Sequence, residues 1–298
     1  MNELVVTSHE VRDALAHRGA IVALETTLVA HGFPAGEGVD VGLEAERRVR
    51  EQGAVPATVG VLDGAVRVGL TPEQLERFDA TAQKAGPRDL AACTVQGRVG
   101  ATTVGGTLAV CRAVGIGFLG TGGIGGVHRR FAERPDVSAD LGELARSEVL
   151  VVCSGVKSLL DVIATVELLE TLAVPVLGWR TETLPLFYRA DGGPPVPARV
   201  ETAEEAARIA RTHWQLGRRS ALVLAQPPAE GVDHVEPLID AALAAADDEA
   251  VAGGAVTPFV LSYLHRESGG RTLAVNKRLV ADNAALAAEV AVAYARLG

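Results

Sequence analysis

A glutamate and a lysine stand at positions where apolar strands should end, which is where a carboxyl group and an amine could meet a ligand. Glu25 ends the stretch IVALE, and Lys157 follows the stretch VLVVCSGV. A carboxyl group that is partly withdrawn from water has a raised pKa and can act as a general acid. A neutral lysine is a nucleophile that forms a Schiff base with a carbonyl carbon or with the anomeric carbon of a sugar.

The position of Lys157 adds to its chemical interest. It is expected to open a helix over the stretch SLLDVIATVELL, where the positive end of the helix dipole and partial burial would disfavour the ammonium form. Each residue also has an ordinary explanation when it is taken alone. A lysine at a helix start is most often a solvated surface charge, and Glu25 could simply pair with a nearby base.

Two aspartates in the stretch PDVSAD suggest a cation. Asp136 and Asp140 flank Ser138 at the expected start of a helix. Their oxygens suit a hard divalent ion, since Mg²⁺ or Mn²⁺ is often bound by one or two carboxylates, waters and a phosphate. The alternative is that Ser138 or Asp140 only caps the helix.

Five glycines lie between residues 120 and 126, and Gly120, Gly122 and Gly125 spell G-x-G-x-x-G. In a dinucleotide-binding turn this pattern opens a helix at once, because the pyrophosphate sits on the helix N-terminus. Here the stretch VHRRFAERPDV follows, with Pro135 inside it and no apolar periodicity. We favour a glycine-lined pocket in which backbone approaches a ligand. Tight packing at a strand exit and a nicotinamide site remain alternatives.

Strand-like and helix-like segments alternate along the chain that must position these groups. Buried strands are expected at 21–26, 116–123, 148–156, 174–179 and 221–228, with helical patterns between them. Such alternation predicts an α/β fold, an α/β/α sandwich around a mainly parallel central sheet, in one domain spanning 1–298. Ligands of such folds lie beyond the carboxyl ends of the strands.

Three local signals are specific. Asp63-Gly64 between two β-rich runs predicts a tight hairpin, because both turn positions need positive φ. Thr71, Pro72 and Gln74 predict a helix start. The segment 184–201, with four prolines and two glycines, is expected to be a surface excursion or a lid.

Composition restricts the class of protein. The chain has 298 residues, 48% of them hydrophobic and 4% aromatic, and a formal charge of −9. The acidic balance argues against a nucleic-acid partner, which needs a basic face. Cys93, Cys111 and Cys153 lack C-x-x-C spacing and are expected to be buried thiols. No stretch reaches the ~18 apolar residues of a membrane span and no signal peptide is evident, so we expect a cytoplasmic protein without membrane contacts.

Taken together, these motifs resemble a known family, the pseudouridine-5′-phosphate glycosidases. The likeness runs from about residue 20 to residue 290. It rests on eight stretches in the same order and spacing: VALETTLVAHGFP, GAVPATVGVLDG, KAGPRDL, GATTVGGT, GTGGIGGVHR, DVSADL, CSGVKSLLD and VTPFVL.

The resemblance implies a homotrimeric enzyme that reversibly cleaves the C–C glycosidic bond of pseudouridine 5′-phosphate to uracil and ribose 5-phosphate. It implies Lys157 as the nucleophile, Glu25 as the proton donor, and Mn²⁺ or another divalent cation held by Asp136. The implied substrate-binding residues are Lys84, Val104, Ser138, Ala139, Asp140, Thr103, His128 and Asn283. The alternatives are a catalytically silent sugar-phosphate binding protein and a nicotinamide-dependent oxidoreductase.

Overall fold

A mainly parallel sheet runs through the computed structural model, which describes residues 4–251 and 253–298. The strands are β1 (Val5–Thr7), β2 (Ile21–Glu25), β3 (Val55–Leu62), β4 (Ala65–Val68), β5 (Gln83–Ala85), β6 (Gly100–Thr102), β7 (Phe118–Gly120), β8 (Val127–His128), β9 (Leu150–Cys153), β10 (Leu160–Asp161), β11 (Val176–Trp179), β12 (Ala198–Val200) and β13 (Leu222–Ala225). The strand order is β1-β4-β3-β2-β7-β9-β13-β11-β12, with β6 paired to β3, and β5 paired to β6. The short strands β8 and β10 form a separate antiparallel pair.

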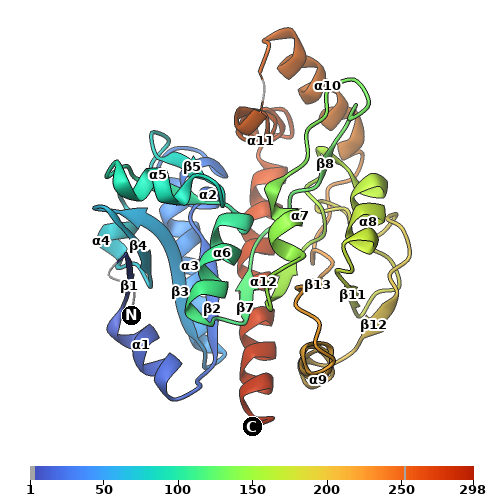
Figure 1. Ribbon diagram of the computed structural model, residues 1–298. Helices are drawn as coiled ribbons and strands as arrows, with labels where there is room; N and C mark the ends of the chain where they lie inside the picture. The colour runs from blue at the N-terminus through green and yellow to red at the C-terminus, as the bar shows by residue number, and fades with distance from the viewer. Residues whose placement is uncertain (1–3, 252) are drawn as a thin grey trace.

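Helices cover both faces of this sheet (Figure 1). They are α1 (His9–Ala16), α2 (Thr27–His31), α3 (Glu37–Glu51), α4 (Pro72–Leu75), α5 (Leu90–Val95), α6 (Val104–Val114), α7 (Ala139–Leu144), α8 (Val162–Thr171), α9 (Ala203–Gln215), α10 (Val235–Asp248), α11 (Val256–Glu267) and α12 (Arg271–Ala295). The predicted α/β fold is confirmed. None of the helices that the structure describes is both long and apolar enough to cross a membrane.

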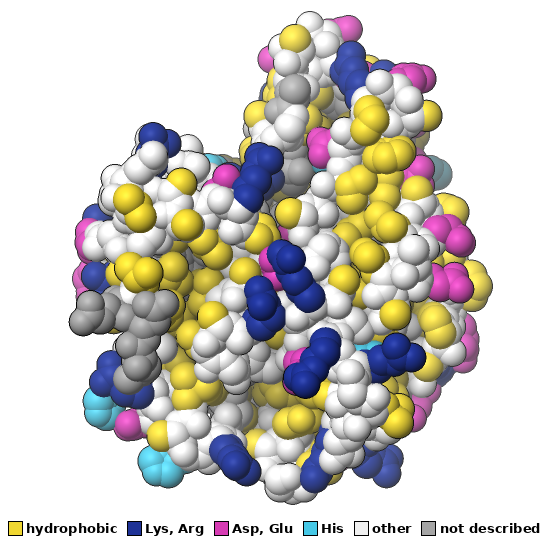
Figure 2. Space-filling view, viewed as in Figure 1, with side chains coloured by type: hydrophobic (Ala, Val, Ile, Leu, Met, Phe, Trp, Pro, Cys, Tyr) yellow, Lys and Arg dark blue, Asp and Glu magenta, His cyan; other side chains and the backbone are white. Residues whose placement is uncertain are grey.

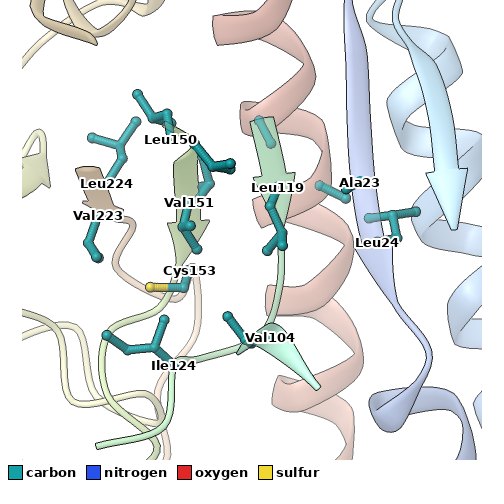
Figure 3. Close-up of a cluster of buried hydrophobic side chains, with 14 of the residues drawn as sticks. Ala23, Leu24, Val104, Leu119, Ile124, Leu150, Val151, Cys153, Val223 and Leu224 are labelled. Carbon is teal, nitrogen blue, oxygen red and sulfur yellow. The ribbon is translucent and has the colours of Figure 1, made fainter. Parts of the chain in front are cut away.

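The core lies between the central strands and α12. β2, β7 and β9 are parallel neighbours, and their residues are buried. Figure 3 shows Leu24, Leu119 and Val151 on these strands, with α12 passing behind β7. α12 passes so close to β7 that a Cβ on Gly120 would lie 2.9 Å from the Cα of Ala284. The sheet therefore packs directly on an alanine-rich helix, and its carboxyl edge is rigidly supported.

Several local predictions are confirmed. Asp63 and Gly64 have φ of 53° and 71° in the turn between the antiparallel strands β3 and β4. Thr71 caps α4 in a complete capping box with Gln74. The three cysteines are free and buried. β5, β6 and α10 were not expected from the sequence.

The helix expected to begin beside Lys157 is a prediction that proved wrong. α8 begins only at Val162, because the side chain of Asp161 accepts a hydrogen bond from the Ala164 amide at 3.0 Å and caps the helix there. Leu160 pairs with His128 in the β8–β10 ribbon and is held extended. Lys157 therefore lies in a turn between β9 and β10 and does not open α8.

The segment 184–201 is also more than a surface excursion. It includes β12 on the edge of the sheet. Leu184, Phe187 and Tyr188 in this segment are 1%, 3% and 0% exposed. The Phe187 amide donates a hydrogen bond to the Ser154 carbonyl at 3.0 Å. These contacts anchor the middle of the segment in the core beside the end of β9.

The glycine tract has a packing role that its sequence pattern did not reveal. None of the five glycines has a φ in the left-handed region. A Cβ on Gly123 would lie 2.7 Å from the ring of Phe187, and one on Gly126 would lie 2.3 Å from Oγ1 of Thr165. The tract leads into β8 and opens no helix, so the dinucleotide interpretation loses its structural basis.

We expect Gly126→Ala to destabilise the fold by about 1–3 kcal/mol, because the added methyl group overpacks a site with no free volume. Thr165 cannot move away freely, since its hydroxyl accepts a hydrogen bond from the Val127 amide and donates one to the Asp161 carbonyl. Urea unfolding gives the measurement. The control is Gly142→Ala in α7, whose Cβ would meet nothing within 4 Å. Equal unfolding midpoints for the two variants would contradict this account of the glycines.

Candidate active site

Glu25 lies at the carboxyl end of β2 and is only 3% exposed. The hydroxyl of Thr121, just beyond β7, donates a hydrogen bond to its Oε1. Its Oε2 has no hydrogen-bond partner among the described residues. Burial raises the pKa of Glu25, and the positive charge of Lys157 opposes that shift. The arrangement favours a protonated carboxyl group whose free oxygen can carry the proton.

Two lysines approach this carboxyl group from different elements. Lys157 follows β9, and its amide donates to the carbonyl of Ile124 in the glycine tract at 3.0 Å. Lys84 lies in β5, and its Nζ is 3.4 Å from the carbonyl oxygen of Gly254. Burial lowers the pKa of Lys84, and the nearby charge of Lys157 lowers it further. The site thus gathers two amines around a buried acid.

A smaller cavity of about 610 Å³ opens beside Glu25, Thr121 and both lysines. Most of its remaining wall is apolar. The apolar side chains come from α2, the adjacent 32–33 turn, the turn after Lys157, the 184–201 segment, α11 and α12: Leu28, Phe33, Leu159, Phe187, Leu261 and Val280. We call this cavity the small chamber, and it suits a flat ligand with few charges.

A larger cavity of about 2030 Å³ adjoins it and has a different character. We call it the large chamber. Its lining includes the arginines Arg88, Arg112 and Arg146. Figure 2 shows several Lys and Arg side chains near the middle of the face that carries α6 and α7. The two chambers share four lining residues: Thr27, Lys84, Lys157 and Thr257. Both lysines therefore stand on the boundary between an apolar and a polar compartment.

Asp136 lines the large chamber, with a side chain that is 43% exposed. His128 of β8 lines the same chamber, with its Nε2 3.7 Å from the Asp136 carboxylate. Burial lowers the pKa of His128 more than the negative charge of Asp136 raises it. No three His, Cys, Asp or Glu side chains form a metal-binding group in the part of the chain that the structure describes. One carboxylate in a polar chamber still fits Mg²⁺ or Mn²⁺, which keep several waters and share a phosphate.

Ser138, Ala139 and Asp140 all line the large chamber at the start of α7. Ser138 caps this helix, as the alternative interpretation proposed. Asp140 is 4% exposed, and its two oxygens accept hydrogen bonds from the amides of Gly105 at 2.7 Å and Gly125 at 2.9 Å. Asp140 thus ties the glycine tract to α6, and Asp136 has the more accessible carboxylate.

The remaining predicted residues divide between the wall and the interior. Thr103 lines the large chamber and caps α6 through a hydrogen bond from the Gly106 amide at 3.1 Å. Val104 is 0% exposed and lines neither chamber, so its contact with a substrate stays a prediction. Asn283 likewise lines neither chamber. It is fully buried in α12 and donates hydrogen bonds to the Thr121 carbonyl at 2.8 Å and the Ser154 hydroxyl at 3.1 Å.

Sequence reasoning missed six polar residues of the small chamber: Thr27, His31, Thr121, Ser158, Thr257 and Asn276. Thr27 lies two residues after Glu25, in ETT, and Thr121 directly follows Gly120, in GTGG, so proximity to residues already singled out was their only signal. The Nε2 of His31 donates a hydrogen bond to the Ala82 carbonyl at 3.1 Å, and burial lowers the pKa of His31. Asn276 lies on α12, far along the chain from the other site residues, and nothing near it in sequence marks it.

The fold and the site define an α/β enzyme with a buried acid and paired lysines at the carboxyl edge of its sheet. The family described as "Indigoidine synthase A like protein" matches residues 10–293. A pseudouridine-5′-phosphate glycosidase of Herpetosiphon aurantiacus is 47% identical over 97% of both chains. The one from Escherichia coli is 41% identical over 99% of this chain and 97% of its own. The chain belongs to the pseudouridine-5′-phosphate glycosidase family.

Solved structures agree with the sequence relationship. The prealnumycin C-glycosynthase AlnA, solved in complex with ribulose 5-phosphate, superposes with a TM-score of 0.90 at 38% identity, covering 100% of this chain and 99% of that one. An indigoidine synthase A-like protein from Thermotoga maritima gives a TM-score of 0.87 at 35% identity, over 97% and 96% of the two chains. These relatives have the same fold as this chain over almost its full length.

The raised pKa of Glu25 predicts a pH-dependent stability. The free energy of unfolding should fall as pH rises from the ordinary glutamate value of 4.5 through the raised folded-state pKa, because the buried carboxylate is then charged. Glu25→Gln should lack this loss, so it should match the wild type below that window and be more stable above it. Urea unfolding over a pH series measures the difference.

Glu44→Gln is the control, because the pKa of Glu44 is shifted in the opposite direction to that of Glu25. Glu44 is exposed, and its hydrogen bond with Arg47 lowers its pKa, so this variant should gain nothing at higher pH. A wild-type pH slope in Glu25→Gln would mean that another group titrates in this window.

Proposed function

We propose that the protein reversibly cleaves the C–C glycosidic bond of pseudouridine 5′-phosphate, giving uracil and ribose 5-phosphate. The observation that carries this proposal is that Lys157 and Glu25 line the same apolar chamber, while Lys157 also borders the polar one. A flat, uncharged base suits the first compartment and a sugar phosphate suits the second. The names of the curated relatives support the same reaction.

The large chamber provides the charge that a sugar phosphate requires. Its wall carries Lys84, Arg88, Arg112 and Arg146, although Glu143 partly neutralises Arg146 through an ion pair. Cationic side chains bind phosphate by charge-assisted hydrogen bonds. A structural relative is described in complex with ribulose 5-phosphate, which is consistent with a sugar-phosphate site in this fold. Binding energy at the phosphate can then hold C1′ of the sugar against Lys157.

Lys157 solves the chemical difficulty of a C-glycoside, which has no heteroatom leaving group. In our proposal its Nζ gives up a proton and bonds to C1′ as the C1′–O4′ bond breaks, and the ring oxygen takes up a proton. The nitrogen lone pair then forms a C1′=N bond as the C1′–C5 bond breaks, and the electron pair passes to uracil, whose C5 is protonated. Water finally hydrolyses the imine, which releases ribose 5-phosphate and restores the amine.

Glu25 is the proton donor in this scheme. Burial raises its pKa, which favours the protonated carboxyl group that a proton donor requires. The Thr121 hydroxyl donates to Oε1, which leaves the proton on Oε2, the oxygen without a partner. The same carboxylate recovers a proton from Lys157 or water as the imine forms and breaks.

Asp136 would hold the divalent cation, with waters and the substrate phosphate as its other ligands. When bound, such an ion offsets phosphate charge and polarises the oxygens that it touches. His128 lies close enough to orient the Asp136 carboxylate. The homotrimeric assembly and the cytoplasmic location stay predictions.

A silent sugar-phosphate binding protein is disfavoured, because binding alone requires no unpaired buried acid beside a lysine. A nicotinamide-dependent oxidoreductase is disfavoured because the glycine tract opens no helix and packs against Phe187, Ser138 and Thr165.

We expect borohydride to trap the imine on Lys157. Adding it to enzyme and ribose 5-phosphate should reduce the C1′=N bond to a stable amine and add the sugar-phosphate mass to the peptide that contains Lys157. Lys157→Ala should lose both the label and uracil release. Lys157→Arg should rescue neither, because guanidinium stays charged. A label on Lys84 would show that Lys84, and not Lys157, is the nucleophile. Uracil release with no adduct on either lysine would exclude the covalent route.

We expect a chelator such as EDTA to abolish uracil release, and added Mn²⁺ to restore it in the wild type but poorly in Asp136→Ala. Calorimetry with Mn²⁺ should show at least ~10-fold weaker binding in the variant, which lacks the carboxylate ligand. Asp191→Ala is the control, because Asp191 is an exposed carboxylate that lines neither chamber. Full turnover in EDTA would remove the ion from the mechanism.

A further inference from the structure

Lys157 begins a turn that has little regular structure of its own. The turn runs from the end of β9 to the two-residue strand β10, and α8 starts only after Asp161. Two backbone hydrogen bonds fix its base: Lys157 donates to Ile124, and Leu160 donates to the Lys157 carbonyl, both at 3.0 Å. The peptide carbonyls at the tip of the turn need another partner.

Arg129 supplies that partner from the far side of the glycine tract. One terminal nitrogen of its guanidinium donates to the Ser158 carbonyl at 3.0 Å, and its Nε lies 3.5 Å from the Leu160 carbonyl. The guanidinium thus spans the residues one and three places after Lys157. Its planar fork can hold both carbonyls in a fixed relation, which an ammonium group cannot do.

Two carboxylates of α10 hold the other side of the guanidinium. Arg129 bonds to Asp240 at 2.9 Å and to Glu236 at 3.2 Å. Figure 1 shows that α10 lies in the part of the molecule that projects beyond the carboxyl edge of the sheet, together with α11. Arg129 therefore joins the turn after Lys157 to α10. Among the described residues, Glu236 and Asp240 form no other ion pair.

We infer that Arg129 is a positioning residue for the proposed nucleophile: it clamps the turn after Lys157 and so keeps the amine directed at the boundary between the two chambers. This inference rests on the proposed function, in which Lys157 attacks C1′. A reacting group must be held within a few tenths of an ångström of its productive position, and a shift of ~1 Å can cost about 10²-fold in rate. Arg129 contacts no substrate chamber, so its effect is exerted entirely through the turn.

The next residue provides a matched control. Arg130 is also an arginine bound to α10, since it forms an ion pair with Asp247, but it has no hydrogen bond to the turn after Lys157. Replacing either arginine removes a link to α10, and only Arg129 holds the Ser158 carbonyl. A second comparison uses the double variant Glu236→Gln/Asp240→Asn, which weakens the link to α10 and leaves the contacts with the turn in place.

The test measures uracil release and imine trapping in the full-length protein. For Arg129→Ala we expect kcat to fall by about 10²-fold with little change in KM, and the borohydride-trapped adduct on Lys157 to form correspondingly more slowly. Arg130→Ala and the double variant should keep most of the wild-type kcat. Arg129→Lys, which can reach one carbonyl but not two, should recover part of the loss. Should Arg129→Ala fail to fold, Arg129→Lys carries the test, with an expected fall of about tenfold in kcat.

Each contrary outcome has one meaning. Wild-type kcat in Arg129→Ala, or in Arg129→Lys if that variant carries the test, overturns the inference. An equal loss in Arg130→Ala or in the double variant also overturns it, because the link to α10 would then be what matters. If the wild type releases uracil but forms no adduct on Lys157, the proposed mechanism fails first and the role of Arg129 fails with it. If an adduct forms on wild-type Lys157 and Arg129→Ala keeps the wild-type kcat, the inference about Arg129 is rejected and the proposed mechanism stands.

Discussion

One buried carboxylate holds the site together. Asp140 accepts a backbone hydrogen bond from Gly105 in the first turn of α6 and another from Gly125 in the glycine tract. A buried charge is costly unless it is hydrogen-bonded, and here both oxygens are satisfied by amides from segments far apart in sequence. The residue before Gly125 is Ile124, whose carbonyl accepts the Lys157 amide. The nucleophile candidate is thereby connected to α6 through the single peptide group between Ile124 and Gly125 and the carboxylate of Asp140.

The same principle applies throughout the site, because backbone and small side chains support its reactive groups. Asn283 fixes the carbonyl of Thr121, and Thr121 in turn donates to Glu25. Glycines allow the tract to approach Ser138, Phe187 and α12 without steric conflict. Rigid support of this kind lets a buried acid and two amines remain close without collapsing into fully satisfied ion pairs.

Local chemistry explains which features could be predicted from the sequence. The Asp63-Gly64 turn and the Thr71 capping box depend on residues within four positions of each other, so the pattern alone identifies them. The start of α8 was misjudged because apolar periodicity runs on upstream of Asp161, whereas the cap and the pairing of Leu160 with His128 decide where the helix begins.

Long-range contacts explain which features could not be predicted from the sequence. β5 and β6 are each three residues long. β5 pairs with β6, and β6 pairs with β3, so both strands depend on residues far away in the sequence and have no local sequence signal. Asn283 was expected beside the substrate, yet its partners are carbonyl and hydroxyl groups behind the glycine tract. Glu25, Lys157 and Lys84, which the resemblance had singled out, line one cavity, because each lies at the same edge of the sheet.

The division of the site into two chambers has a consequence for how such proteins diversify. Only four residues line both compartments, so most substitutions in the apolar wall leave the polar wall untouched. If the substrate binds as proposed, changes at small-chamber residues such as Phe33, Leu261 or Asn276 alter the base that is accepted and leave the proposed phosphate-binding wall unchanged. Specificity for the group bound in the small chamber can therefore change while the residues at the boundary, Lys84 and Lys157 among them, stay the same.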